Sequence, residues 1–214
     1  MKIYSLPSRC EALLFDIDLT LYRDKGYYNS QADLLIRRFA EVQGVGLQEA
    51  ERMVEAERNS YKQESGGKVT SLGNIYLRLG VTIEESVRWR EELFTPERFL
   101  RGDTLLKATL EKLTIGRRIA AVTNNPASIG VRTLSALGVF EFFSIVVGLD
   151  TCMISKPAEE PFRYALKSLE SHPNSAVCVG DRFVVDLEIP LAMGMGAILV
   201  ESMEDVYRLP QVLT

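Results

Sequence analysis

Residues 12–20 have the sequence ALLFDIDLT, in which a short apolar run leads directly into Asp16 and Asp18. Such a run is typical of a strand that is buried on both faces of a sheet. Similar runs recur along the chain, at 119–122, 144–147, 176–179 and 197–200. Segments with a helical pattern separate them, near 104–113, 127–137, 158–170 and 184–193. This alternation predicts βαβ units, and therefore an α/β fold built on a Rossmann-like parallel sheet.

The stretch 22–101 contains no convincing strand and has the pattern of helices instead. Asn29 or Ser30 could cap a first helix that continues to about Val42. A second helix is expected at about 47–62, after a pair of glycines that would end the first. The sequence therefore predicts a helical block inserted after the first core strand.

Two further helix starts lie in the second half of this block. The segment Thr82–Glu85 has the pattern of a capping box, and Thr95 precedes a proline at a first helical position. We therefore predict an α/β core domain formed by residues 1–21 and 102–214. Residues 22–101 are expected to form an all-helical cap domain.

Length and composition exclude several classes of protein. The 214 residues are 46% hydrophobic and 25% charged, as in globular domains, and the net charge is −4. Without a basic excess, we expect no nucleic-acid partner. No apolar run approaches the length of a membrane span, and we see no signal peptide in the first residues, so no membrane partner and a cytoplasmic location are expected.

Cysteine and histidine are too few to build the common metal or disulfide sites. The three cysteines are widely spaced and there is one histidine, His172, in a segment that resembles a loop. This count argues against a disulfide framework and against a zinc site. Any catalysis must therefore depend on carboxylates, lysine or hydroxyl groups.

Polar residues of that kind follow four of the predicted strands: Asp16 and Asp18, Thr123, Lys156, and Asp181 with Asp186. Because ligands bind at the carboxyl ends of the strands in an open parallel sheet, these side chains should converge on one crevice. Clustered carboxylates repel one another unless a cation lies between them, and Mg²⁺ prefers carboxylate and phosphate oxygens. The residues therefore predict a magnesium site at which a phosphoryl group is attacked.

The spacing of these residues suggests which chemical role each of them has. Asp16 and Asp18 are two apart, so that in extended backbone they point the same way, and one could be the nucleophile while the other transfers the leaving-group proton. Thr123 precedes a predicted helix and could bind a phosphate oxygen together with backbone N–H groups. Lys156 would balance the negative charge of the phosphate and of Asp16.

Taken in order, four short motifs resemble those of the haloacid dehalogenase-like superfamily of phosphohydrolases. They are Asp16-x-Asp18-x-Thr20, Thr123-Asn124, Lys156-Pro157 and Gly180-Asp181-x-x-x-x-Asp186. The resemblance extends from about residue 10 to 200, and the helical insertion is similar to that superfamily's α-helical cap. The stretch FDIDLTLY is most similar to the pyrimidine 5′-nucleotidase-type branch, and less specifically to phosphoglycolate phosphatases.

The resemblance implies a role for each motif residue. Asp16 corresponds to the nucleophile and a Mg²⁺ ligand, and Asp18 to the general acid/base, whose backbone carbonyl also contacts the metal. The remaining correspondences are Thr123, Asn124 and Lys156 to phosphate-binding residues, Asp181 to a Mg²⁺ ligand, and Asp186 to a direct or water-bridged one. Leu19 and Arg182 depart from the usual motifs, because Gly or Asn is commoner at the first position and a small residue at the second.

We therefore expect a magnesium-dependent phosphomonoesterase that acts on a small metabolite through an aspartyl-phosphate intermediate. A 5′-nucleotide is the first expectation for the substrate, and phosphoglycolate or a sugar phosphate the second. Two alternatives stay open: a β-phosphoglucomutase-like phosphotransferase and a non-catalytic phosphometabolite-binding protein. Arg23 and Lys62 are candidates for substrate specificity, and the sequence is silent on oligomeric state.

Overall fold

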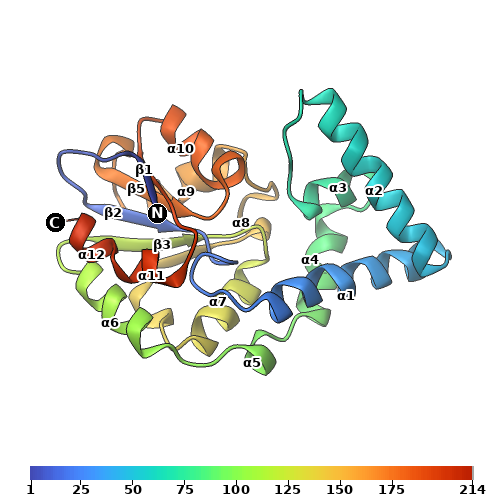
Figure 1. Ribbon diagram of the computed structural model, residues 1–214, viewed down its shortest axis with the longest axis horizontal. Helices are drawn as coiled ribbons and strands as arrows, with labels where there is room; N and C mark the ends of the chain where they lie inside the picture. Colours follow the sequence, from blue (N-terminus) through green and yellow to red (C-terminus); the bar gives the residue numbers. More distant parts are fainter. Residues whose placement is uncertain (214) are drawn as a thin grey trace.

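A computed structural model describes residues 1–213, and its centre is a six-stranded sheet with helices on both faces (Figure 1). The spatial order of the strands is β1-β6-β5-β2-β3-β4. Their bounds are β1 Lys2–Ser5, β2 Ala12–Phe15, β3 Arg118–Val122, β4 Ile145–Val147, β5 Ala176–Gly180 and β6 Gly196–Leu199. All neighbouring strands are parallel except β1, which is antiparallel to β6. The predicted α/β class is confirmed.

The five predicted strands are all present, with ends that differ from the prediction by at most one residue. The edge strand β1 was not predicted. Its four residues are exposed or only partly buried, so no continuous apolar run marks it. It is held by its pairing with β6, which shifts register between Ile3 and Ser5.

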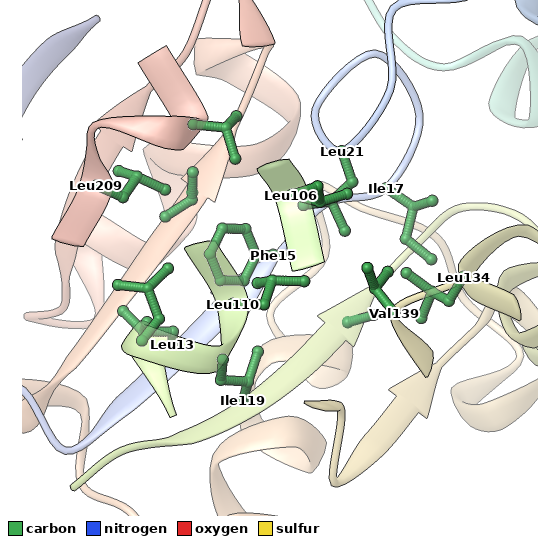
Figure 2. Packing of buried hydrophobic residues seen from close by; sticks show 14 of the residues in the cluster. Leu13, Phe15, Ile17, Leu21, Leu106, Leu110, Ile119, Leu134, Val139 and Leu209 are labelled. Carbon is green, nitrogen blue, oxygen red and sulfur yellow. The ribbon is translucent and has the colours of Figure 1, made fainter. Parts of the chain in front are cut away.

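The alternation of side chains along β2 divides the core into two layers. Leu13 and Phe15 point into the larger cluster, and Figure 2 shows Phe15 among its leucines. The helices that cover this cluster are α6 (Thr104–Leu113), α7 (Ala127–Ala136), α11 (Met203–Tyr207) and α12 (Leu209–Val212). Ala12 and Leu14 point into the second cluster, on the opposite face, with residues of α9 (Glu160–Ser168). Because both faces are covered, β2 is apolar at every position.

Three core helices follow predicted segments closely, namely α6 Thr104–Leu113, α7 Ala127–Ala136 and α9 Glu160–Ser168, and α10 Glu188–Ala192 lies within a fourth. The sequence did not predict the short helices α8 Leu149–Cys152, α11 Met203–Tyr207 and α12 Leu209–Val212. Short 3₁₀ turns lie at Phe140–Phe142 and Pro173–Ser175. The single helix expected at 184–193 is wrong in detail, because the segment begins as the π-helical turn η3 (Phe183–Leu187) and only then continues as α10.

The inserted stretch is helical, as predicted. Its helices are α1 Lys25–Gln43, α2 Leu47–Glu64, α3 Leu72–Arg78, α4 Ile83–Leu93 and α5 Pro96–Phe99. The expected start of α1 at Asn29 or Ser30 is wrong: the Asp24 carboxylate accepts a hydrogen bond from the Tyr27 N–H and caps the helix five or six residues earlier. The capping box of α4 is present, with Thr82 and Glu85 bonded reciprocally.

Helices α1–α4 lie beside the sheet and share an apolar cluster of their own (Figure 1). Phe39, Tyr76 and Trp89 form its aromatic centre, and Ile129 of α7 joins it from the core. The helices therefore pack on one another and on α7, which places their inner surfaces over the carboxyl ends of the strands. No helix within residues 1–213 is long and apolar enough to cross a membrane.

Candidate active site

The order of the strands reverses at β2, and this reversal positions the site. From β2 the chain adds β3 and then β4 on one side, whereas β5 and β6 lie on the other. A crevice forms at such a switch point, outside the carboxyl ends of the two central strands. Asp16 directly follows β2 and Asp181 directly follows β5, so both are held at this crevice.

Three carboxylates meet there, as the sequence predicted. Asp16, Asp181 and Asp186 each offer an oxygen, and these oxygens all lie within 4.8 Å of one another. Asp186 reaches the cluster because η3 folds back against the end of β5, where a Cβ on Gly180 would lie only 2.5 Å from the Asp186 Cβ. The glycine before Asp181 is therefore a packing requirement of the acid cluster.

Lys156 neutralises part of this charge. Its ammonium donates to Asp16 Oδ1 at 2.7 Å, to Asp186 Oδ1 at 2.8 Å and to the Val122 carbonyl at 2.7 Å, and its side chain is 1% exposed. Burial acts to lower the pKa of Lys156, but the two carboxylates outweigh it and the net shift is upward. Lys156 is therefore a buried cation fixed between two acids.

The remaining negative charge makes a further cation favourable. Burial, together with the Asp186 and Asp181 carboxylates, raises the pKa of Asp16 to about 7 against the opposing effect of Lys156. Burial likewise raises the pKa of Asp181 to about 6. Asp181 Oδ1 is buried and accepts no hydrogen bond within the described residues, although Arg182 Nε lies 3.6 Å away. This all-oxygen donor set, with one unbonded acceptor, fits a hard divalent cation such as Mg²⁺.

Removing the lysine should destabilise the fold strongly. Lys156→Met leaves Asp16 and Asp186 buried without their cation, so we expect the free energy of unfolding to fall by about 3–5 kcal/mol in metal-free buffer. Urea denaturation measures this loss. Lys107→Met is the matched control, because Lys107 pairs with Glu141 on the surface, and its variant should unfold almost as wild type does. Equal losses for the two variants would contradict this assignment.

Asp18 lies in a different environment from Asp16. Its Oδ1 accepts from the Tyr22 hydroxyl at 2.5 Å and from Gln31 Nε2 at 3.0 Å. Its Oδ2 accepts from Asn125 Nδ2 at 3.0 Å and, weakly, from the Thr123 hydroxyl at 3.5 Å. The two acids therefore line one cavity with separate partners, Asp16 in the charged cluster and Asp18 among neutral donors.

The backbone between the two acids is shaped by their neighbours. Ile17 points into the core, and the Thr20 hydroxyl donates to Asp16 Oδ2 at 2.9 Å. Leu19 has a φ of 57°, in the left-handed region that Gly and Asn adopt most easily. This explains why leucine is an unusual residue at that point of the motif.

Asn124 contacts the lysine loop. Its side-chain oxygen accepts from the Lys156 N–H at 2.8 Å and its nitrogen donates to the Lys156 carbonyl at 3.2 Å. The Thr123 hydroxyl accepts from the Asn125 N–H at 3.1 Å. Through these contacts, Asn124 holds the loop that carries Lys156. Asn124 also lines the cavity.

The cavity above these residues has a volume of about 490 Å³ and is walled by both the core and the helical insertion. The insertion contributes most of its polar lining, from Tyr28 and Gln31 of α1, Lys62 of α2 and Arg90 of α4. Lys62, a predicted specificity residue, therefore lines the cavity. Arg23, the other, is not among the lining residues and donates to the Val200 carbonyl at 2.8 Å.

Several residues of the site were not singled out from the sequence. Gln31 and Asn125 bond to each other at 3.1 Å as well as to Asp18, so they connect α1 to the core. Asn125 could have been inferred from its place beside Thr123-Asn124. Gln31 could not, because nothing in a helical pattern shows which polar residue faces the rest of the molecule.

A family model described as haloacid dehalogenase-like hydrolase matches residues 13–200. The HAD phosphatase of Thermococcus onnurineus has a similar fold, with a TM-score of 0.65 and 22% identity over 95% of this chain and 97% of the other. At that identity the likeness demonstrates the shared fold.

The curated relatives are phosphatases by name. A phosphoglycolate phosphatase of Colwellia psychrerythraea is 33% identical over 79 residues, which are 37% of this chain and 35% of the relative. A ribulose-1,5-bisphosphate 5-phosphatase of Halopiger xanaduensis is 27% identical over 207 residues, which are 91% of this chain and 86% of the relative. The alignments with the first relatives thus span only about a third of their length.

Proposed function

This chain belongs to the family of haloacid dehalogenase-like hydrolases, and on that premise we propose that it is a magnesium-dependent phosphomonoesterase for small phosphate esters. The observation that carries the proposal is the pairing of two differently placed acids at the floor of one cavity. Asp16 lies against Lys156 and two further carboxylates, and Asp18 lies among neutral donors. Such a division suits one acid for attack and the other for proton transfer.

In the first half of the reaction, Asp16 attacks the phosphorus atom and the ester oxygen departs. The Thr20 hydroxyl and the Lys156 ammonium fix the Asp16 carboxylate in place. Asp18 protonates the departing oxygen. Its weakest bond, to Thr123 at 3.5 Å, is the easiest to release, and this would free the Thr123 hydroxyl for a phosphate oxygen. Mg²⁺ bound by Asp16, Asp181, Asp186 and the Asp18 carbonyl would offset the charge of the phosphoryl group.

In the second half, Asp18 accepts a proton from the water that hydrolyses the aspartyl-phosphate, and inorganic phosphate leaves. Gln31 of α1 contributes here, because its bonds to Asp18 and Asn125 exist only while the helical insertion lies over the core. We propose on this basis that residues 22–101 act as a cap domain that orients Asp18 and excludes bulk water.

Phosphoglycolate and sugar phosphates are the substrates that the names of the relatives favour, and a 5′-nucleotide is the remaining candidate. A phosphate-release panel over these esters and p-nitrophenyl phosphate tests the proposal. We expect release with Mg²⁺, loss of release in excess chelator, and recovery when Mg²⁺ is restored. Turnover that persists in chelator would exclude the metal-dependent mechanism.

The same panel separates the alternatives. A β-phosphoglucomutase-like transferase would convert glucose 1-phosphate to its isomer faster than it releases phosphate. A non-catalytic binding protein would bind one ester tightly and release phosphate from none. Either result would replace the phosphatase proposal.

A further inference from the structure

Arg90, near the end of α4, is a buried cation without an anionic partner. It is 4% exposed, and no carboxylate in the described part of the chain lies within ion-pair distance of it. Its only hydrogen bonds there run from Nη1 to the carbonyl and hydroxyl oxygens of Ser86, one turn earlier on the same helix. Buried arginines are almost always paired, since an uncompensated buried charge is costly.

Its surroundings keep the guanidinium charged and open on one side. Burial lowers the pKa of Arg90 to about 10, which leaves it cationic at neutral pH. Nε and Nη2 have no hydrogen-bond acceptor among residues 1–213. Gly73 lies beside Nη2, where a Cβ would come within 3.2 Å, and both residues line the cavity that contains Asp16 and Asp18. The absent side chain at position 73 thus leaves Nη2 facing the cavity.

The other cations of the cavity wall differ from Arg90. Lys68 pairs with Glu188 at 3.0 Å, and Arg182 contacts the acid cluster. Arg58 lies 3.8 Å from Glu55, and Lys62 is exposed to solvent. Arg90 alone in this set is both deeply buried and free of a carboxylate, so its missing partner is expected to come from the ligand.

We propose that Arg90 binds a second anionic group of the substrate, so that the preferred ester carries a carboxylate or a second phosphate remote from the reacting phosphate. This inference rests on the proposed phosphatase function and narrows its substrate class. A planar guanidinium with Nε and Nη2 free can donate two parallel hydrogen bonds to either oxyanion. Neutral-tailed sugar monophosphates would leave the charge unpaired and should bind less well.

Binding of phosphonates tests the inference without turnover. Three ligands share one phosphonate head: propylphosphonate has a methyl tail, 3-phosphonopropionate a carboxylate, and propane-1,3-bisphosphonate a second phosphonate. Calorimetric titration in saturating Mg²⁺ should show that at least one anionic-tailed ligand binds wild type more tightly than propylphosphonate. The ratio to compare is the Kd of propylphosphonate divided by the Kd of the anionic-tailed ligand. In Arg90→Met this ratio should fall by at least about 30-fold. Whichever ligand shows the change identifies the carboxylate or the phosphate as the natural tail.

Arg88→Met is the matched control, because Arg88 is exposed on the same helix, and it should leave the ratio at its wild-type value. Gly73→Val provides an independent variant that covers Nη2 while retaining the guanidinium, and it should lower the ratio as well. Circular dichroism confirms that each variant is folded. If Arg90→Met fails to fold, the Gly73→Val result decides.

The outcomes separate the inference from the proposed function. An unchanged ratio in the folded variants, or equal binding of all three ligands by wild type, overturns the role of Arg90 even if p-nitrophenyl phosphate is hydrolysed. Conversely, a charge preference that depends on Arg90, in a protein that hydrolyses no ester, would overturn the phosphatase proposal and keep the anion site.

Discussion

Asp16→Asn should lower kcat about a million-fold for every ester that the protein hydrolyses, which is the scale of losing a catalytic nucleophile. The amide has the shape of the carboxylate but not the charge that attacks phosphorus. It can still accept from Lys156, whose second carboxylate partner, Asp186, remains in place, so the variant should fold. Single-turnover phosphate release, with thermal unfolding measured in parallel, provides the test.

Asp103→Asn is the control for Asp16→Asn. Asp103 caps α6 through bonds from the Leu105 and Leu106 N–H groups and is not among the residues that line the cavity, and asparagine caps helices equally well. This variant should keep wild-type turnover. Retention of even a tenth of wild-type turnover by Asp16→Asn would exclude Asp16 as the nucleophile.

Asp18→Asn should have the second-largest effect, and the size should depend on the leaving group. General acid catalysis contributes about 10²–10⁴-fold, most of it for poor leaving groups. An alkoxide needs the proton, whereas nitrophenolate leaves without it. We therefore expect phosphorylation of Asp16 to slow about 10²–10⁴-fold with an alkyl ester and only mildly with p-nitrophenyl phosphate.

The burst phase separates this effect from dephosphorylation, which also uses Asp18 and is common to both esters. Rapid-quench measurement of released alcohol or phenol gives the rate of the first step directly. Equal slowing of both esters by Asp18→Asn would mean that Asp18 acts through structure or the metal site, and not as the leaving-group acid.

The core of the fold and of the site was predictable because local patterns determine both. A four-residue apolar run such as 12–15 requires burial on both faces, and that requirement implies helices above and below the sheet. In a parallel sheet the carboxyl ends share one edge, so the residues after β2 and β5 had to meet. The meeting of Asp16 and Asp181 follows from this topology, whereas Asp186 joins them through the turn η3, which the sequence did not predict.

Features that depend on the packing of the inserted helices could not be predicted in this way. Helical periodicity identifies α1 and α4, but it does not show that Gln31 would reach Asp18 or that Arg90 would lose its contact with solvent. Both outcomes depend on how the inserted helices pack against the sheet and its helices. The edge strand β1 was missed for a related reason, since its stability comes from pairing with β6 and not from its own composition.

The departures from the usual motifs also have physical explanations in the structure. Leu19 occupies a left-handed position at some conformational cost. Arg182 lies between Asp181 and Asp186 at 3.6 and 3.9 Å, and its backbone N–H donates to Asp186 at 3.0 Å. It contributes positive charge beside the acid cluster and also lines the cavity. Neither Leu19 nor Arg182 prevents Asp16, Asp181 and Asp186 from coming together.

The central claim is that the phosphoryl group passes through Asp16, and trapping that intermediate tests it most directly. A single turnover with Mg²⁺ and a reactive ester, quenched in acid and reduced with borohydride, converts a phosphorylated aspartate to homoserine, which peptide mapping locates. We expect homoserine at position 16, and its formation should require both the ester and Mg²⁺. It should be absent when the reaction is quenched only after the turnover is complete, because the aspartyl-phosphate has then been hydrolysed. Homoserine at another position, or none while a burst of alcohol precedes phosphate release, would contradict it.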